Sequence, residues 1–238
     1  MKHHLRVATL FASIVQGGCL SPHIIRHELP LLRNPAEAFA RLGCLPSDRE
    51  PLAFDCRAVS GRERLGCDRL LVDPLLGGLT PAEPIAACLL LEFGAADPTE
   101  PYVHDSRTPL LSVFTRFLVL TKSGPVLLTS KEELRVRYAP IDSPTEALSC
   151  ALASTGLLPL TNVKLPRGYR YVADRIEETH VEATAEGYVV KPLQHDAPVC
   201  WVGRLDTTDL LVTRDGFARP LATATLYELK DPTRRCDI

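Results

Sequence analysis

Three pairs of polar residues in this 238-residue chain have the types and spacing that could support metal binding or acid–base chemistry. The first pair is His23 and His27, which on a helix would place two imidazoles one turn apart on one face. The metalloprotease form of this spacing has a glutamate directly after the first histidine, and Ile24 stands there instead. That form also needs a third ligand. We therefore expect these histidines to lie in a polar tether and to bind no metal.

The other two pairs are His104-Asp105 and His195-Asp196. An aspartate can orient an imidazole for general-base catalysis, but neighbours in sequence seldom serve each other in this way. Both pairs fall in segments that we expect to be loops. Neither pair therefore has a catalytic role in our leading interpretation.

Glu177, Glu178 and Glu182 could supply the paired carboxylates of a glycosidase. On an alternating strand, Glu178 and Glu182 would share one face with His180, and we expect that face to be the solvated one. The chain contains no Gly-x-Ser-x-Gly, Ser-x-x-Lys, phosphate-loop or Gly-x-Gly-x-x-Gly motif. The sequence therefore predicts no catalytic residue and no cofactor.

The charge balance excludes one class of partner. The chain has 27 Lys and Arg residues against 29 Asp and Glu residues, which gives a formal net charge of −2. Proteins that bind nucleic acids neutralise phosphates with a basic excess, which is missing here. The hydrophobic content of 45% is that of a globular protein.

The N-terminal segment has the order of a secretory signal. A basic head with Lys2 and Arg6 precedes the apolar run Val7–Val15, and Gly17-Gly18 then leads to Cys19. The apolar run is far shorter than the ~20 residues that a membrane-spanning helix needs. The glycines before Cys19 resemble the lipobox of bacterial lipoproteins. That resemblance implies cleavage after residue 18, a lipid on the Cys19 thiol, and anchoring to a membrane.

Eight cysteines fit an oxidising compartment, and the absence of Cys-x-x-Cys argues against a zinc ribbon or a thioredoxin-like motif. Cys200 and Cys236 bracket the final strand region, and we expect them to form a disulfide. The alternative for Cys200, a thiol nucleophile with His195 as its base, is not our leading interpretation. Two further sets stay open. A loop-rich stretch could be stapled by Cys56–Cys67 or Cys44–Cys67, whereas small core positions are expected for Cys88 and Cys150.

The elements that would position these residues follow from caps and turns. Asn34-Pro35 starts a helix, and capping boxes at Ser130–Glu133 and Ser143–Glu146 start two more. Residues 44–84 and 94–110 read as loops. Expected strands cover 113–120, 125–129, 171–184, 188–193, 199–213 and 217–229. The pattern predicts an α+β fold in which short helices pack on a C-terminal antiparallel meander. We expect a signal peptide over 1–18, a tether over 19–33, a cysteine-containing region over 34–110 and an α+β domain over 111–238.

Several motifs resemble those of uncharacterised exported lipoproteins of myxobacterial type. They are Ser143–Leu148 with Thr155-Gly156, Ile176–Glu182, Gly187-Tyr188, Val212–Gly216 and Cys236-Asp237. A helix followed by a meander is also similar in topology to PepSY and cystatin-like domains. These resemblances imply no catalytic residue.

The leading interpretation is therefore an exported, lipid-anchored cell-envelope protein with a binding or structural role, whose partners are the membrane and an envelope protein. The alternatives are an envelope hydrolase that uses His104 or His195, and a secreted inhibitor or toxin-like module.

Overall fold

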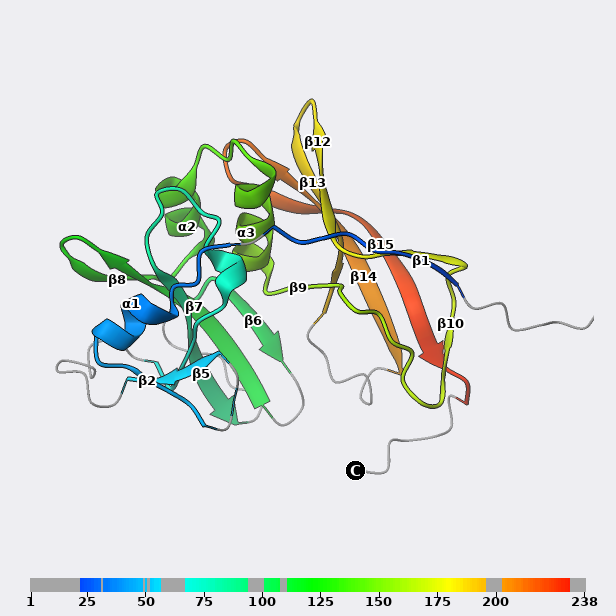
Figure 1. Ribbon diagram of the computed structural model, residues 1–238, viewed down its shortest axis with the longest axis horizontal. Coiled ribbons are helices and arrows are strands. Elements are labelled where there is room, and N and C mark those ends of the chain that lie inside the picture. Colours follow the sequence, from blue (N-terminus) through cyan, green and yellow to red (C-terminus); the bar gives the residue numbers. More distant parts are fainter. Residues whose placement is uncertain are drawn as a thin grey trace, which may run out of the picture.

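A computed structural model describes residues 22–30, 32–48, 50, 52–56, 67–93, 101–107, 111–195 and 203–231 (Figure 1). Strands far outnumber helices in these residues, and the pairings inside both large sheets are antiparallel. The fold is thus β-rich rather than the α+β fold expected. None of the helices described there has both the length and the apolar character needed to cross a bilayer. The predictions for the signal peptide, Cys19 and the Cys200–Cys236 pair lie outside the described residues.

The first sheet is built from the N-terminal half of the chain around the long strand β7. Its order is β2-β3-β4-β5-β7-β6, and β8 also pairs with β7. The strands are β2 (Leu45–Pro46), β3 (Ala53–Asp55), β4 (Arg69–Leu71), β5 (Ile85–Phe93), β6 (His104–Arg107), β7 (Leu111–Thr121) and β8 (Gly124–Leu128). Three of them lie in the stretch 44–84 that we expected to be irregular. We expected one region of the chain to end at residue 110 and the next to begin at 111. The first sheet joins strands from both regions, because β5 pairs with β7 from Ile85–Val119 to Phe93–Leu111.

The second sheet is the expected C-terminal meander, in which β12, β13, β14 and β15 pair in sequence order. Its strands are β9 (Leu158–Pro159), β10 (Tyr169–Tyr171), β12 (His180–Thr184), β13 (Gly187–Gln194), β14 (Arg204–Thr213) and β15 (Ala218–Leu229). The single strand expected over 171–184 is wrong. That segment changes partner twice, because β10 pairs with β15, β11 (Arg175–Glu177) pairs with β1 (His23–Ile25), and β12 pairs with β13.

The described helices are short: α1 (Ala36–Arg41), α2 (Lys131–Tyr138), α3 (Pro144–Thr155) and the 3-10 helix η2 (Pro74–Leu76). Of these, α3 lies where the two sheets meet, whereas α1 lies beside the first sheet (Figure 1). Both capping boxes are confirmed, because the hydroxyls of Ser130 and Ser143 accept hydrogen bonds from the backbone N–H groups of Glu133 and Glu146.

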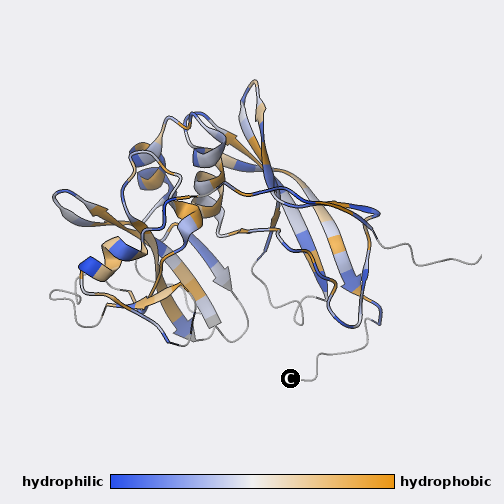
Figure 2. Ribbon diagram, viewed as in Figure 1, coloured by the Kyte–Doolittle hydropathy of each residue, from blue (hydrophilic) through white to orange (hydrophobic). Residues whose placement is uncertain are grey.

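One core joins the sheets through α3. Leu148 of α3 is fully buried in a cluster that also holds Phe117 of the first sheet and Val190 of the second. Figure 2 shows apolar residues running through the central strands next to the helices. The two sheets therefore share this cluster of buried side chains.

Candidate functional site

The segment expected to be a free tether is paired with the body of the protein. Strand β1 runs parallel to β11, with His23 opposite Arg175 and Ile25 opposite Glu177. Backbone hydrogen bonds of 2.9 Å from His23 N–H to the Asp174 carbonyl and of 2.8 Å from Glu178 N–H to the Ile25 carbonyl extend the contact. Since parallel strands keep their register, this pairing carries the next residues of the N-terminal segment toward the start of β12.

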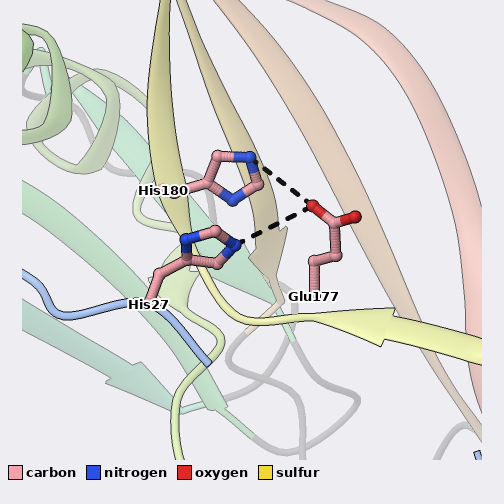
Figure 3. Close-up of side chains that lie close together, drawn as sticks. All are labelled: His27, Glu177 and His180. Atoms are coloured by element: carbon pink, nitrogen blue, oxygen red, sulfur yellow. Dashed lines mark ion pairs between the residues drawn. The ribbon is translucent and has the colours of Figure 1, made fainter. Parts of the chain in front are cut away.

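His27, two residues beyond β1, meets His180 and Glu177 at that place (Figure 3). The two imidazole rings stack with their centroids 4.1 Å apart and an interplanar angle of 25°. Both Nε2 atoms face one oxygen of Glu177, at 3.9 Å from His27 and 3.6 Å from His180. We call these three residues the His27–Glu177–His180 cluster. Their ligand atoms all lie within 4.8 Å of one another, and each residue is partly buried.

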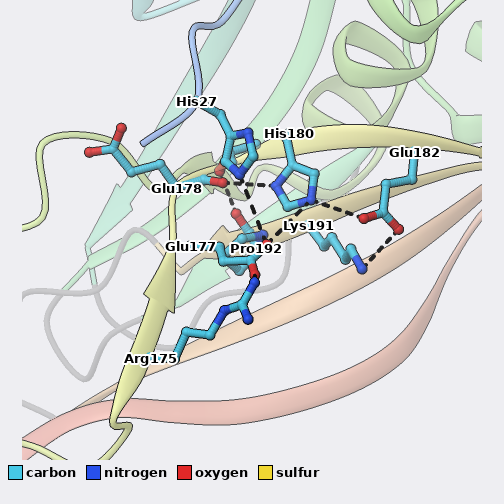
Figure 4. Close-up of polar contacts among 9 residues, drawn as sticks. His27, Arg175, Glu177, Glu178, His180, Glu182, Lys191 and Pro192 are labelled. Carbon is cyan, nitrogen blue, oxygen red and sulfur yellow. Dashed lines mark hydrogen bonds and ion pairs between the residues drawn. The ribbon is translucent and has the colours of Figure 1, made fainter. Parts of the chain in front are cut away.

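Neighbouring groups orient Glu177 and His180 (Figure 4). The Arg175 guanidinium donates to Oε1 of Glu177 at 2.5 Å, which leaves Oε2 to face the two histidines. The Nδ1 atom of His180 lies 3.0 Å from the carbonyl oxygen of Glu178. A carbonyl and a carboxylate only accept hydrogen bonds, so a proton on Nδ1 serves the Glu178 carbonyl, and a proton on Nε2 would serve Glu182, whose Oε1 lies 3.2 Å from that nitrogen.

A buried corner fixes where β12 begins. The Thr179 side chain is fully buried, and its hydroxyl accepts a hydrogen bond of 2.7 Å from Leu160 N–H while donating to the Pro192 carbonyl. The pairing of β13 with β14 shifts register between Val190 and Leu193. At the same place, the partner on the opposite edge of β13 changes from β12 to β9. A proline is tolerated at such an irregularity because no ladder hydrogen bond is lost there. The corner holds His180 at the first position of β12.

Charged residues surround the cluster on the sheet side. Lys191 donates to Glu182 at 2.9 Å, and this hydrogen bond, with a smaller contribution from His180, lowers the pKa of Glu182. The hydrogen bond with Glu182 in turn raises the pKa of Lys191. Burial raises the pKa of Asp209, whereas the positive charge of Lys191 opposes that change. Electrostatic interactions therefore connect the cluster with β13 and β14.

The structure contradicts the side of the strand expected for Glu178. Glu178 is only 6% exposed, and its carboxylate accepts a hydrogen bond from Asn162 N–H, so it does not belong to the solvated face expected for it. The alternation fails because the strand is interrupted at 178–179. Glu182 is exposed as expected. Glu177, which the sequence offered only as one of the paired carboxylates of a glycosidase, contacts both histidines.

The other histidines singled out in the sequence do not belong to the His27–Glu177–His180 cluster. His23 is exposed on β1. Because this segment is extended and not helical, His23 and His27 do not lie one helical turn apart. His104 lies on β6 rather than in a loop, with its ring against Gly156 and 6.0 Å from the Phe117 ring centroid. Burial lowers the pKa of His104 to about 4, with a further contribution from Lys131. His195 is exposed, and Asp196 lies outside the described residues.

The cysteine pairing differs from both expected staples. The disulfides are Cys44–Cys56 and Cys67–Cys88, so Cys56–Cys67 and Cys44–Cys67 are wrong, and Cys88 is not a free core thiol. Cys150 is free and buried on α3, as expected. Burial raises the pKa of its thiol to about 11, which keeps it protonated and unreactive near neutral pH.

Comparison of the chain with protein-family models, curated proteins and solved structures gave no match. The chemistry therefore has to be argued from the residues. Two imidazole nitrogens and a carboxylate oxygen are donors typical of sites for Zn²⁺ and related divalent ions. Within the described part of the chain, this is the cluster in which three such donors come together.

Proposed function

We propose that this protein is exported and lipid-anchored at the cell envelope, where it has a binding role rather than a catalytic one. The observation that carries the proposal is the pair of disulfides in the first sheet, Cys44–Cys56 and Cys67–Cys88. Structural disulfides persist in oxidising compartments and are rare in the reducing cytosol. They are compatible with an envelope or extracellular location, which is where the signal-like order of residues 1–19 would send the chain.

The distance between Cys19 and the first strand supports anchoring close to a membrane. Strand β1 begins at His23, four residues after Cys19. Four fully extended residues span at most ~14 Å. A lipid on Cys19 would therefore hold the β1–β11 pair near the membrane surface.

The candidate groups for a hydrolase are held in other roles, which favours binding. The lowered pKa of His104 keeps its ring neutral at pH 7, and the ring packs against Gly156 and near Phe117. The Cys150 thiol stays protonated in the core. The His27–Glu177–His180 cluster, by contrast, collects residues from two distant segments around one partly buried point, as expected of a site that holds a ligand.

Fractionation of cells that produce the native chain tests the proposal. We expect the product to start at Cys19, to carry the added mass of acyl chains, and to sediment with membranes. Cys19→Ser should release it into the soluble fraction, whereas His23→Gln, a nearby change that keeps the thiol, should leave it on the membrane. A product that retains Met1, or membrane association that survives Cys19→Ser, would contradict lipid anchoring.

A further inference from the structure

We infer that the His27–Glu177–His180 cluster is a binding site for one divalent transition-metal ion of the Zn²⁺ type, and that the bound ion fastens the N-terminal segment to the second sheet. The site would identify a divalent metal ion as the ligand of the proposed binding role. Only its position near a membrane rests on the proposed function, and the tests below use purified protein, so their outcome is independent of where the protein resides.

The spacing of the three donors is close to that of a zinc site. With bonds of ~2.0–2.1 Å, tetrahedral geometry separates two ligand atoms by roughly 3.3 Å. The distances from Glu177 Oε2 to the two Nε2 atoms are 3.6 and 3.9 Å. Small rotations of the stacked rings would close this difference. Three protein ligands would leave a fourth position for water or an external ligand, as in open zinc sites.

In its neutral form with the proton on Nδ1, His180 turns an Nε2 lone pair toward the centre of the cluster. His180 uses the proton on Nδ1 for the Glu178 carbonyl, and its Nε2 faces carboxylate oxygens of Glu182 at 3.2 Å and Glu177 at 3.6 Å. The Nε2 atom of His27 is buried and has no hydrogen-bond partner. Acceptors that face one another in this way repel unless a proton or a metal ion lies between them. A metal ion satisfies all of them at once.

The surroundings already contain the groups that orient metal ligands elsewhere. A ligating histidine usually donates its second ring N–H to a carbonyl or carboxylate, and ligating carboxylates are themselves hydrogen-bonded. His180 donates to the Glu178 carbonyl, and Glu177 accepts from Arg175. These contacts orient Nε2 and Oε2 before any ion binds.

The local charge favours a cation, and the donor types select its class. Glu177, Glu182 and Asp209 give three negative charges against two from Arg175 and Lys191, a balance of −1 when both imidazoles are neutral. Nitrogen donors favour Zn²⁺, Co²⁺, Ni²⁺ or Cu²⁺ over Mg²⁺ and Ca²⁺. Protonation of the histidines is the competing way to supply positive charge.

A bound ion would also have a mechanical effect. The N-terminal segment is held to β11 by a pairing of only three residues, His23–Ile25 with Arg175–Glu177. His27 follows that pairing on the N-terminal segment, whereas Glu177 and His180 belong to the body of the protein. A metal bond to all three would therefore lock the segment that leads from Cys19 onto the second sheet.

Calorimetric titration of Zn²⁺ into purified, chelator-treated full chain tests the site. We expect one equivalent to bind, and Co²⁺ in its place should give the visible absorption bands of a four-coordinate site with nitrogen ligands. His27→Gln, Glu177→Gln and His180→Gln should each weaken binding by about 100-fold or more, since loss of mere supporting partners already costs 10–100-fold. His23→Gln, which removes the exposed histidine of the same segment, should bind as the wild type does.

Two results would overturn the site. One is the absence of saturable Zn²⁺ binding at micromolar concentrations. The other is binding that the three ligand variants retain at wild-type strength, which would place the ion elsewhere, for example at His3-His4. Thermal unfolding of each variant without metal provides the folding control. Since His27 lies on a peripheral segment, His27→Gln keeps the test valid even if another variant unfolds.

Hydrogen exchange of backbone amides tests whether the ion holds the N-terminal segment on the second sheet. With Zn²⁺, amides of residues 22–30 should exchange at least severalfold more slowly in the wild type and in His23→Gln, but not in Glu177→Gln. Protonation alone would give the opposite dependence, with slower exchange on acidification and no effect of Zn²⁺ near neutral pH. Tight Zn²⁺ binding without any slowing would refute the mechanical part of the inference.

Discussion

The two sheets are stabilised in different ways, although they share one core. The first sheet contains short strands, β2, β3 and β4, and both disulfides of the described residues lie in it. The second sheet is a meander of longer strands joined by tight turns, such as Asp215-Gly216 between β14 and β15. It has no disulfide among the residues described. Covalent bonds thus stabilise the edge of the first sheet formed by the short strands β2, β3 and β4, where few backbone hydrogen bonds are available.

The comparison shows what each kind of stabilisation demands of the sequence. A meander forms from neighbours along the chain, so each turn and each strand pattern carries its own local signal. The two- and three-residue strands β2, β3 and β4 have no such signals, and cross-links compensate there by restricting the unfolded chain. The predictions below test where the sheets behave as one unit and where they differ.

The largest effect is expected from the core that the sheets share. Leu148 on α3 is fully buried between them, so Leu148→Ala should reduce the free energy of unfolding by about 3–4 kcal/mol through lost burial and a cavity. Hydrogen exchange should show equal loss of protection in β7 and β14. Leu221→Ala, at a leucine that is 46% exposed on β15, should change stability by no more than about 0.5 kcal/mol. Loss of protection in one sheet alone would show that the two unfold separately.

The disulfides should produce the next largest effect. Closing loops of 12 and 21 residues gives stabilisations of about 2.8 and 3.3 kcal/mol in the chain-entropy model. Cys67→Ala with Cys88→Ala should therefore cost slightly more than Cys44→Ala with Cys56→Ala in urea denaturation without reductant. Peptide mapping without reduction should find both pairs in the native protein. Equal stability of either double variant and the wild type would show that the staples are dispensable.

Acid should destabilise the protein through a histidine of the first sheet. The folded pKa of His104 is about 4, below its ordinary value of 6.5, so the unfolded chain takes up this proton first as the pH falls. The stabilisation is complete above pH 6.5 and is lost as the pH falls through about 4. At 1.36 kcal/mol per unit, the total is about 3 kcal/mol.

The slope of stability against pH provides the measurement for His104. Between pH 6.5 and 4, the unfolded wild type binds about one more proton than the folded protein because of His104. His104→Gln should remove this difference and so reduce the slope of the unfolding free energy by about 1.4 kcal/mol per pH unit. His195→Gln, at an exposed histidine, should keep the slope of the wild type. An unchanged slope in His104→Gln would mean that the ring is protonated in the folded state at these pH values.

Local signals predicted much of the second sheet and its helices. The capping boxes at Ser130 and Ser143 start α2 and α3, and the turn at Asp215-Gly216 joins β14 to β15. Each of these features depends on residues within a few positions of one another, which is why the sequence alone was sufficient.

The candidate site could not be predicted, because its parts are brought together by long-range pairing. His27 and Glu177 are separated by 150 positions, and the parallel pairing of β1 with β11 leaves no local pattern in the sequence. The same holds for Cys67–Cys88, which depends on the register of β4 against β5. The misplacement of Glu178 has a related cause, since β11 and β12 take different partners and the alternation stops between them.

The smallest effect tests two helix caps of matched geometry in different surroundings. In α2, the Ser130 hydroxyl accepts from Glu133 N–H at 3.2 Å, and in α3 the Ser143 hydroxyl accepts from Glu146 N–H at 3.2 Å. Both glutamates also accept from a backbone N–H just before the cap, at Thr129 and Asp142 respectively.

Burial should make the second cap the more important one. Glu146 is only 9% exposed on a helix that contacts both sheets, whereas Glu133 lies on the surface. Removing a cap costs about 0.5–2 kcal/mol, and the upper half of that range applies where water cannot replace the lost acceptor. Ser143→Ala should therefore cost about 1–2 kcal/mol and Ser130→Ala about 0.5–1 kcal/mol in urea denaturation. A larger cost for Ser130→Ala would show that α2, and not α3, is the helix on which the joint stability of the two sheets depends.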